Sequence, residues 1–254
     1  AMGFKAGRDS LVLTSKRVLV IDVQGFTGRR IAYESTPYSS IRAFSVESAG
    51  TFDRDAELKI HTRNHWTRST IAQDLRKGRA DILAIQSYLA SQVIGKDDGT
   101  SAVGPDPVPS QFPTSVGGVE GFLGWLGDDA HQIDAQTVNE RLHNDTPILL
   151  PDEVVDVAFK CGRDMYVHTS KRMLFVDVQG WTGKKVEYQS VPLKFCTGFE
   201  VETAGYLDRD CDIRVHVDCP NLSLIKQDIR SNSVDVFQLQ NTLAAKLAQF
   251  PQLF

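Results

Sequence analysis

The sequence predicts a mainly β protein that consists of two tandem copies of one small domain, each a curved sheet or partly open barrel with a C-terminal helix. The repeat emerges when the segment that starts at Thr14, TSKRVLVIDVQGFTGRRIAYESTP, is compared with the segment that starts at Thr169, TSKRMLFVDVQGWTGKKVEYQSVP. The spacing between the two is far too long for a solenoid repeat. Within each copy, strand-like patterns come first and one helical pattern comes last. These observations predict the fold class.

Strand patterns fill the first part of each copy. The apolar runs 17–22 and 172–177 have the length of strands, and each is followed by a Gln-Gly turn signal. Apolar and polar residues alternate over 58–63 and again over 213–218, which is the pattern of a half-buried antiparallel strand. Tyr33 and Tyr188 are expected to be buried equivalently, and the family resemblance described below implies about seven antiparallel strands in each copy.

The end of each copy changes to a helical period. One face of the predicted helix carries Ile82, Ile85, Leu89 and Val93 in the first copy, and Val236, Leu239, Leu243 and Leu247 in the second. This spacing predicts an amphipathic helix that packs against the sheet of its own copy.

The chain divides into residues 1–94 (the first repeat), 95–118 (a linker) and 119–254 (the second repeat with a short helical lead-in). Proline, glycine, serine and acidic residues dominate 95–118, so this segment cannot bury a core. Asp134 is a suitable N-cap for a helix in the lead-in, with Val138 and Leu142 one turn apart. The first repeat lacks a counterpart of roughly 121–158 and is expected to be truncated at its N-terminus. Its first strand is therefore expected to be short and to leave an open edge.

The motifs of each copy resemble the bacterial-type pleckstrin-homology-like (PH-like) domains. The resemblance rests on TSKR, DVQG, the following Thr-Gly and basic pair, SVESAG or VETAG, the strand that begins FDRD or LDRD, and the final helix. It implies two tandem PH-like partly open barrels or sandwiches, each capped by a C-terminal helix. It also implies a tendency to assemble into rings through sheet edges.

Composition excludes several classes of function. The net charge of −4 gives no basic field to attract nucleic acid. No metal-ligand spacing, catalytic triad order, phosphate-binding glycine loop or pair of catalytic carboxylates is present, so we expect no enzyme, no metal and no cofactor. The four cysteines, Cys161, Cys196, Cys211 and Cys219, have no zinc-like spacing, and the first three align with Ala6, Ile41 and Ala56. They are expected to be buried free thiols of a cytoplasmic protein.

Basic doublets flank the same predicted hairpin in each copy. They are Lys16-Arg17 and Arg29-Arg30 in the first repeat, and Lys171-Arg172 and Lys184-Lys185 in the second. One interpretation is a pocket for an anionic, phosphorylated lipid headgroup, because lysine and arginine bind phosphate well. The other is that these are solvated charges that protect strand ends from aggregation.

The segment GFLGWLG is the candidate partner surface. It carries Phe122, Leu123, Trp125 and Leu126 between glycines. An exposed cluster of this kind marks a binding surface, whereas a buried one would only pack against its own domain. The acidic turns at 53–55 and 208–210 and the strand histidines His61 and His216 are expected to be structural.

The function expected from the sequence is a non-catalytic tandem adaptor or scaffold that binds a protein partner, with self-assembly as an option that the resemblance implies. The alternative is peripheral recruitment to an anionic membrane lipid through the basic hairpins. Ionic strength distinguishes the two, since only the electrostatic mode weakens sharply with salt.

Overall fold

A computed structural model describes residues 1–25, 28–50, 55–64, 69–76, 80–95, 132–179, 185–203, 210–230 and 235–250. Within these ranges the first repeat contains seven strands and one helix: β1 (Met2–Ala6), β2 (Asp9–Leu13), β3 (Arg17–Gln24), β4 (Arg30–Pro37), β5 (Ile41–Glu47), β6 (Asp55–Thr62), β7 (Thr70–Arg76) and α1 (Ile82–Val93). The first four strands form one antiparallel sheet in chain order, and β5 to β7 form a second antiparallel set.

The second repeat has the same elements after a lead-in of β8 (Gln132–Ile133) and α3 (Ala135–Asn144). They are β9 (Val155–Cys161), β10 (Asp164–Thr169), β11 (Arg172–Gln179), β12 (Lys185–Pro192), β13 (Cys196–Glu202), β14 (Asp210–Val217), β15 (Leu224–Arg230) and α4 (Val236–Leu247). The strands of each repeat pair in the same order, and in the described part of the chain neither set of sheets closes into a barrel. The predicted mainly β class with a helix after each set of strands is confirmed.

Side chains of the repeated motifs close the turns. Thr14 Oγ1 accepts from the Arg17 N–H at 2.9 Å, and Thr169 Oγ1 accepts from the Arg172 N–H at 2.9 Å. Asp9 accepts from the Val23 N–H and Asp164 from the Val178 N–H, both at 2.9 Å. Such bonds satisfy backbone groups that a turn leaves unpaired. Much of the internal sequence identity therefore maintains local structure.

Each α-helix in the described residues, α1, α3 and α4, has an aspartate as its N-cap. Asp81 accepts from two backbone N–H groups of α1, Asp235 accepts from two of α4, and Asp134 accepts from that of Thr137 in α3. An aspartate in this position satisfies donors that have no partner inside the helix. The helix predicted after Asp134 is confirmed, and the predicted rows Ile85–Leu89 and Leu239–Leu243 are buried.

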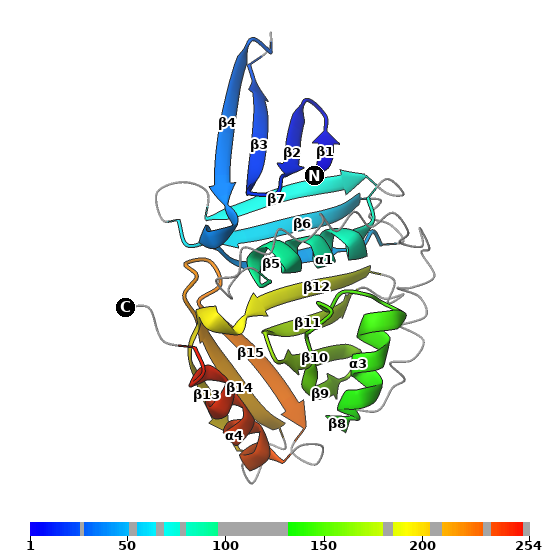
Figure 1. Ribbon diagram of the computed structural model, residues 1–254, viewed down its shortest axis with the longest axis vertical. Helices are drawn as coiled ribbons and strands as arrows, with labels where there is room; N and C mark the ends of the chain where they lie inside the picture. Colours follow the sequence, from blue (N-terminus) through cyan, green and yellow to red (C-terminus); the bar gives the residue numbers. More distant parts are fainter. Residues whose placement is uncertain are drawn as a thin grey trace.

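The two repeats share one sheet, which the sequence did not predict. Strand β5 of the first repeat pairs with β12 of the second, so that eight strands run in the order β7-β6-β5-β12-β11-β10-β9-β8 (Figure 1). The apolar cores nevertheless remain distinct. Helix α1 covers the core of the first repeat and α4 that of the second, while α3 covers the other face of β9–β12.

The expected equivalence of the two tyrosines is wrong. Tyr188 is fully buried, whereas Tyr33 is 67% exposed. The two residues occupy the same place in their strands, but β12 is paired on both sides and its outer face packs against α3, Ile148 and Leu149. Within the described residues β4 pairs with β3 alone. Different neighbours therefore give the same residue opposite environments.

Candidate interaction surfaces

The joint between the repeats is a short antiparallel ladder. Tyr188 pairs with Val46 and Ser190 with Phe44. The Ser48 N–H donates to the Val186 carbonyl, and the Val186 N–H donates to Ser48 Oγ, both at 2.8 Å. Along a strand, the backbone N–H and C=O groups of successive residues point alternately to its two neighbouring strands. Residues 186, 188 and 190 therefore direct their N–H groups at β5.

A buried polar cluster lies beside this ladder. Arg172 is fully buried, and its Nε lies 2.9 Å from Glu153 Oε1, which is also fully buried. The same guanidinium donates to Ser190 Oγ at 2.9 Å. Gln86 of α1 donates to Ser190 Oγ from the other repeat. A buried charge requires such partners, and here they also connect the two repeats.

Polar contacts on the other side of the joint lie nearer to solvent. Arg42 Nε lies 3.2 Å from Asp218 Oδ2, and its guanidinium stacks 4.2 Å from the centre of the Phe195 ring. Asn221 donates to Thr70 Oγ1 at 3.0 Å. The two repeats are held by the β5–β12 ladder, by the buried polar cluster and by the contacts of Arg42 and Asn221. Together these contacts indicate a fixed arrangement of the two repeats.

The joint is formed by β12 and β5, and the strands that correspond to these two in the other repeats lie at opposite ends of the molecule. Strand β4 corresponds to β12, and β13 corresponds to β5. Among the described residues β4 pairs with β3 alone and β13 with β14 alone, so each presents an edge (Figure 1). Unpaired strand edges are templates for strand addition.

In the second repeat, the three described residues of the basic doublets form ion pairs. Lys171 Nζ lies 2.6 Å from Asp152, and its hydrogen bond lowers the pKa of that carboxyl group. Arg172 is buried with Glu153, and Lys185 Nζ lies 2.6 Å from Glu47 at the joint. Lys184 lies outside the described residues. Lys171, Arg172 and Lys185 therefore already have carboxylate partners.

In the first repeat, the two doublets lie at opposite ends of the β3–β4 hairpin. Arg17 pairs with Pro37 and Arg30 with Gln24, which separates the doublets by about 23 Å at the usual rise per strand residue. Near Arg29 and Arg30 the structure places Arg8, whose Nη1 donates to the Gly25 carbonyl at 2.9 Å. No sequence pattern connects Arg8 with Arg29 and Arg30, because Arg8 lies in a different turn.

Several other predicted sites cannot be placed. Phe122, Leu123, Trp125 and Leu126 lie outside the described residues, as do 53–54 and 208–209. Anion binding at the basic doublets and partner binding at GFLGWLG both remain predictions.

The titratable side chains of the core are buried among residues of the fold. Burial lowers the pKa of His168 to about 4, and its Nε2 lies 3.4 Å from Gln227 Oε1. Burial raises the pKa of the Cys196 thiol to about 12, and none of the four cysteines forms a disulfide. Cys196, Cys211 and Cys219 are buried as expected, whereas Cys161 is only partly buried. His216 Nε2 lies 3.0 Å from Glu200 on the surface. Over the described part of the chain, no three His, Cys, Asp or Glu side chains are close enough to hold a metal ion.

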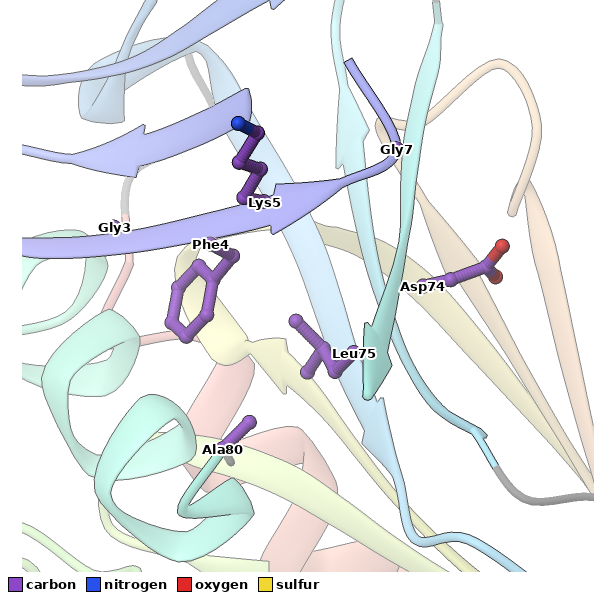
Figure 2. A pocket seen from close by; sticks show the side chains of 7 residues that line it. All are labelled: Gly3, Phe4, Lys5, Gly7, Asp74, Leu75 and Ala80. Carbon is purple, nitrogen blue, oxygen red and sulfur yellow. The ribbon is translucent and has the colours of Figure 1, made fainter. Parts of the chain in front are cut away.

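A cavity of about 500 Å³ opens between β1 and β7 of the first repeat. Phe4, Lys5, Leu75 and Ala80 are among the residues that line it, and in Figure 2 the side chains of Phe4 and Lys5 extend from opposite faces of β1. In the second repeat, β8 pairs with β9 at Ala158 and Phe159, which are equivalent to Gly3 and Phe4. The described part of the first repeat has no such strand, since β1 pairs with β2 alone. Within the described residues β1 therefore has no strand on its outer side, and it forms over five residues, against seven for β9. Truncation of the first repeat remains a prediction.

The described helices include none that is long and apolar enough to span a membrane. Comparison with known proteins shows that residues 1–93 and 125–247 match the family model described as "Bacterial PH domain". The uncharacterized protein YjqA of Bacillus subtilis is 38% identical over 125 residues, which cover 49% of this chain and 97% of that protein. A second B. subtilis protein, YozO, is 27% identical over 90 residues, covering 35% of this chain and 74% of its own length.

Two solved structures are similar in sequence over one repeat. A pleckstrin-homology domain protein from Shewanella loihica is 35% identical, covers 48% of this chain and 99% of its own, and superposes with a TM-score of 0.42. A pleckstrin homology domain from Shewanella amazonensis is also 35% identical, with coverage of 50% and 98% and a TM-score of 0.39. None of these descriptions names a catalytic activity. With a family match over both repeats, the chain belongs to the bacterial PH domain family and carries two copies of its domain.

Proposed function

We propose that this chain is a non-catalytic adaptor or scaffold that self-assembles head to tail through the edges of β4 and β13. The observation that supports this most is the joint inside the chain. There, the counterpart of β13 is paired with the counterpart of β4. The same chain therefore contains an example of the contact and, among the described residues, a copy of each of its two strands with a sheet neighbour on one side only.

Side chains around the two edges repeat those of the joint. Gln86 and Ser190, which bond across the joint, correspond to Gln240 on α4 and Ser35 on β4. Leu83 packs at the joint, and its counterpart Phe237 is 76% exposed. An exposed aromatic residue beside an open edge is typical of a surface that becomes covered on association.

The geometry of such a contact determines what it can build. A head-to-tail contact joins two different surfaces, so each added copy leaves one new edge of each kind. Assemblies of this type either close into a ring or grow as a filament. By analogy with the joint, Tyr33 of one copy would pair with Val201 of the next, and Ser35 with Phe199.

Proline substitution in β4 tests this function. Ser35→Pro removes an N–H that the analogy directs at the added strand, while proline is tolerated on an edge whose N–H faces solvent. The wild-type chain should increase in mass with concentration in sedimentation experiments, and Ser35→Pro should shift this association to at least about tenfold higher concentration. Ser35→Thr retains both the N–H and the hydroxyl group and is the matched control. Equal association of Ser35→Pro and wild type, or a wild type that remains monomeric, would contradict the proposal.

One observation favours a second function, the recruitment of anionic lipid. Arg8, Arg29 and Arg30 come together where the β1–β2 turn meets the tip of the β3–β4 hairpin. Guanidinium groups are well suited to phosphate. Liposomes with a phosphorylated lipid should bind the chain, and this binding should weaken with salt and with Arg29→Ala plus Arg30→Ala. Lys194→Ala, in the second repeat, is the control, and equal binding to neutral liposomes would exclude this function.

A further inference from the structure

The first repeat carries a histidine on the face of its sheet that meets the second repeat. His61 lies on β6, where its cross-strand neighbours are Ala43 of β5 and Thr70 of β7. Cross-strand neighbours share one face of a sheet. Ala43 is completely buried, and it belongs to the apolar core of the second repeat rather than to that of its own. The second repeat therefore packs against the face that carries His61.

A chain of hydrogen bonds connects His61 to the second repeat. Its Nδ1 lies 3.1 Å from Thr70 Oγ1, and Asn221 Nδ2 donates to the same oxygen at 3.0 Å. The Thr70 hydroxyl, which accepts from Asn221, can donate its own proton only to an Nδ1 that carries none. The neutral imidazole fits this arrangement, whereas an imidazolium presents a donor in place of the acceptor.

The surroundings of His61 also disfavour its charged form. Burial lowers the pKa of its imidazole, and the positive charge of Lys59, two residues away on the same face of β6, lowers it further. The other charged groups on this face and at the end of the joint are Glu57 of β6, Glu47 of β5, Asp74 of β7, and Arg42, Arg63 and Asp218. Among the described residues, no carboxylate bonds to His61 itself.

The sister histidine shows the same position in a different setting. His216 occupies the equivalent place on β14. Its side chain is 44% exposed, and its Nε2 lies 3.0 Å from Glu200 Oε1. A carboxylate partner at the surface is compatible with an imidazolium. Among the described contacts, the second repeat is what distinguishes the surroundings of His61 from those of His216.

We propose that the joint between the repeats is a pH-sensitive contact that acid weakens, because the separated repeats accommodate a proton on His61 and the docked repeats do not. The sign follows from linkage. A histidine whose charged form is disfavoured by docking stabilises the joint fully above about pH 6.5, and this contribution is lost as the pH falls. The proposal uses contacts within one chain and does not depend on head-to-tail assembly.

An NMR titration of the His61 ring tests the coupling between proton and joint. In the wild-type chain the midpoint should lie below the ordinary value of about 6.5. Ser48→Pro with Asn221→Ala removes both Ser48 bonds of the joint and the Asn221 bond, so the midpoint should rise toward the ordinary value. The midpoint of His216 should be the same in both proteins. An unchanged His61 midpoint in a variant whose joint has lost its hydrogen-exchange protection would overturn the proposal.

Hydrogen exchange measures the joint directly and needs no destabilised variant. The protection factors of the Ser48 and Val186 amides should fall as the pH is lowered from about 7.5 to about 5.5. His61→Gln keeps a neutral side chain that can bond to Thr70, and it should remove a part of this fall that amounts to at most about tenfold per pH unit, the limit for one proton. His216→Gln is the matched control and should behave as wild type does. The same pH dependence in wild type and His61→Gln would contradict the proposal.

Discussion

At the level of single residues, the two copies act as natural substitution experiments within one chain. Thr14 and Thr169 make the same turn bonds, which explains why TSKR occurs twice. Cys211 and Ala56 are both buried, so a small apolar side chain meets the need of this position. Leu13 and His168 are also both buried, although one is apolar and the other titratable. The threonines are therefore kept for their hydrogen bonds. At the other two positions the requirement is a side chain that fits the available volume.

His168 should make the stability of the fold depend on pH. Burial holds its pKa in the folded state near 4, below the ordinary value of about 6.5, so the unfolded chain binds the proton more readily. Stability is complete above about pH 6.5 and should fall by roughly 3 kcal/mol as the pH drops to about 4.

Substitution by the sister residue isolates this contribution. His168→Leu should retain more of its free energy of unfolding at pH 4, measured by urea denaturation at several pH values. His61 also has a pKa lowered mainly by burial and remains in both proteins, so the difference between them belongs to His168. An identical pH dependence in wild type and variant would show that another group dominates.

At the level of elements, β4 and β12 share a pattern but not an environment. The sequence could predict that both are strands, because apolar residues alternate in each. Which face would be covered depends on α3, on 148–150 and on the neighbouring repeat. The alternation of apolar residues within one strand does not show which segments will pack against it. For this reason the burial of Tyr33 was wrongly predicted.

The lead-in should also determine how much each of the equivalent residues Arg17 and Arg172 contributes to the free energy of unfolding. Arg172→Ala removes one half of a buried ion pair and should cost roughly 3–5 kcal/mol of unfolding free energy. Arg17→Ala, at an exposed position, should change it by no more than about 0.5 kcal/mol. Urea denaturation measures both.

A double variant separates charge from packing. Arg172→Met with Glu153→Leu replaces the ion pair by apolar groups and should recover much of the loss. Equal costs for Arg17→Ala and Arg172→Ala would show that the buried pair does not stabilise the fold.

At the level of the whole molecule, the continuous sheet makes the two repeats one mechanical unit. A sheet of eight strands spans the boundary through the pairing of β5 with β12, and Gln86, Ser190 and Arg172 connect the two halves beside it. The same contact leaves β4 and β13 as the ends of the unit.

The repeats should therefore unfold together. Hydrogen exchange of β6 in the first repeat and β14 in the second should report the same free energy of opening, and Arg172→Ala should lower both values. Gln240→Ala, on the equivalent but exposed face of α4, is the control. Two separate transitions, with β6 unaffected by Arg172→Ala, would mean that the joint contributes little.

The sequence by itself determined the duplication, the strand and helix patterns, the aspartate that starts α3 and the burial of the two helix rows, because these follow from local spacing and turn chemistry. Only the tertiary structure decided that β5 pairs with β12, that Arg172 is buried while Arg17 is exposed, and that the two basic doublets of the first repeat lie far apart. Those outcomes depend on which edges and faces meet, and strand pairing between distant segments is set by the sum of many contacts that no single motif encodes.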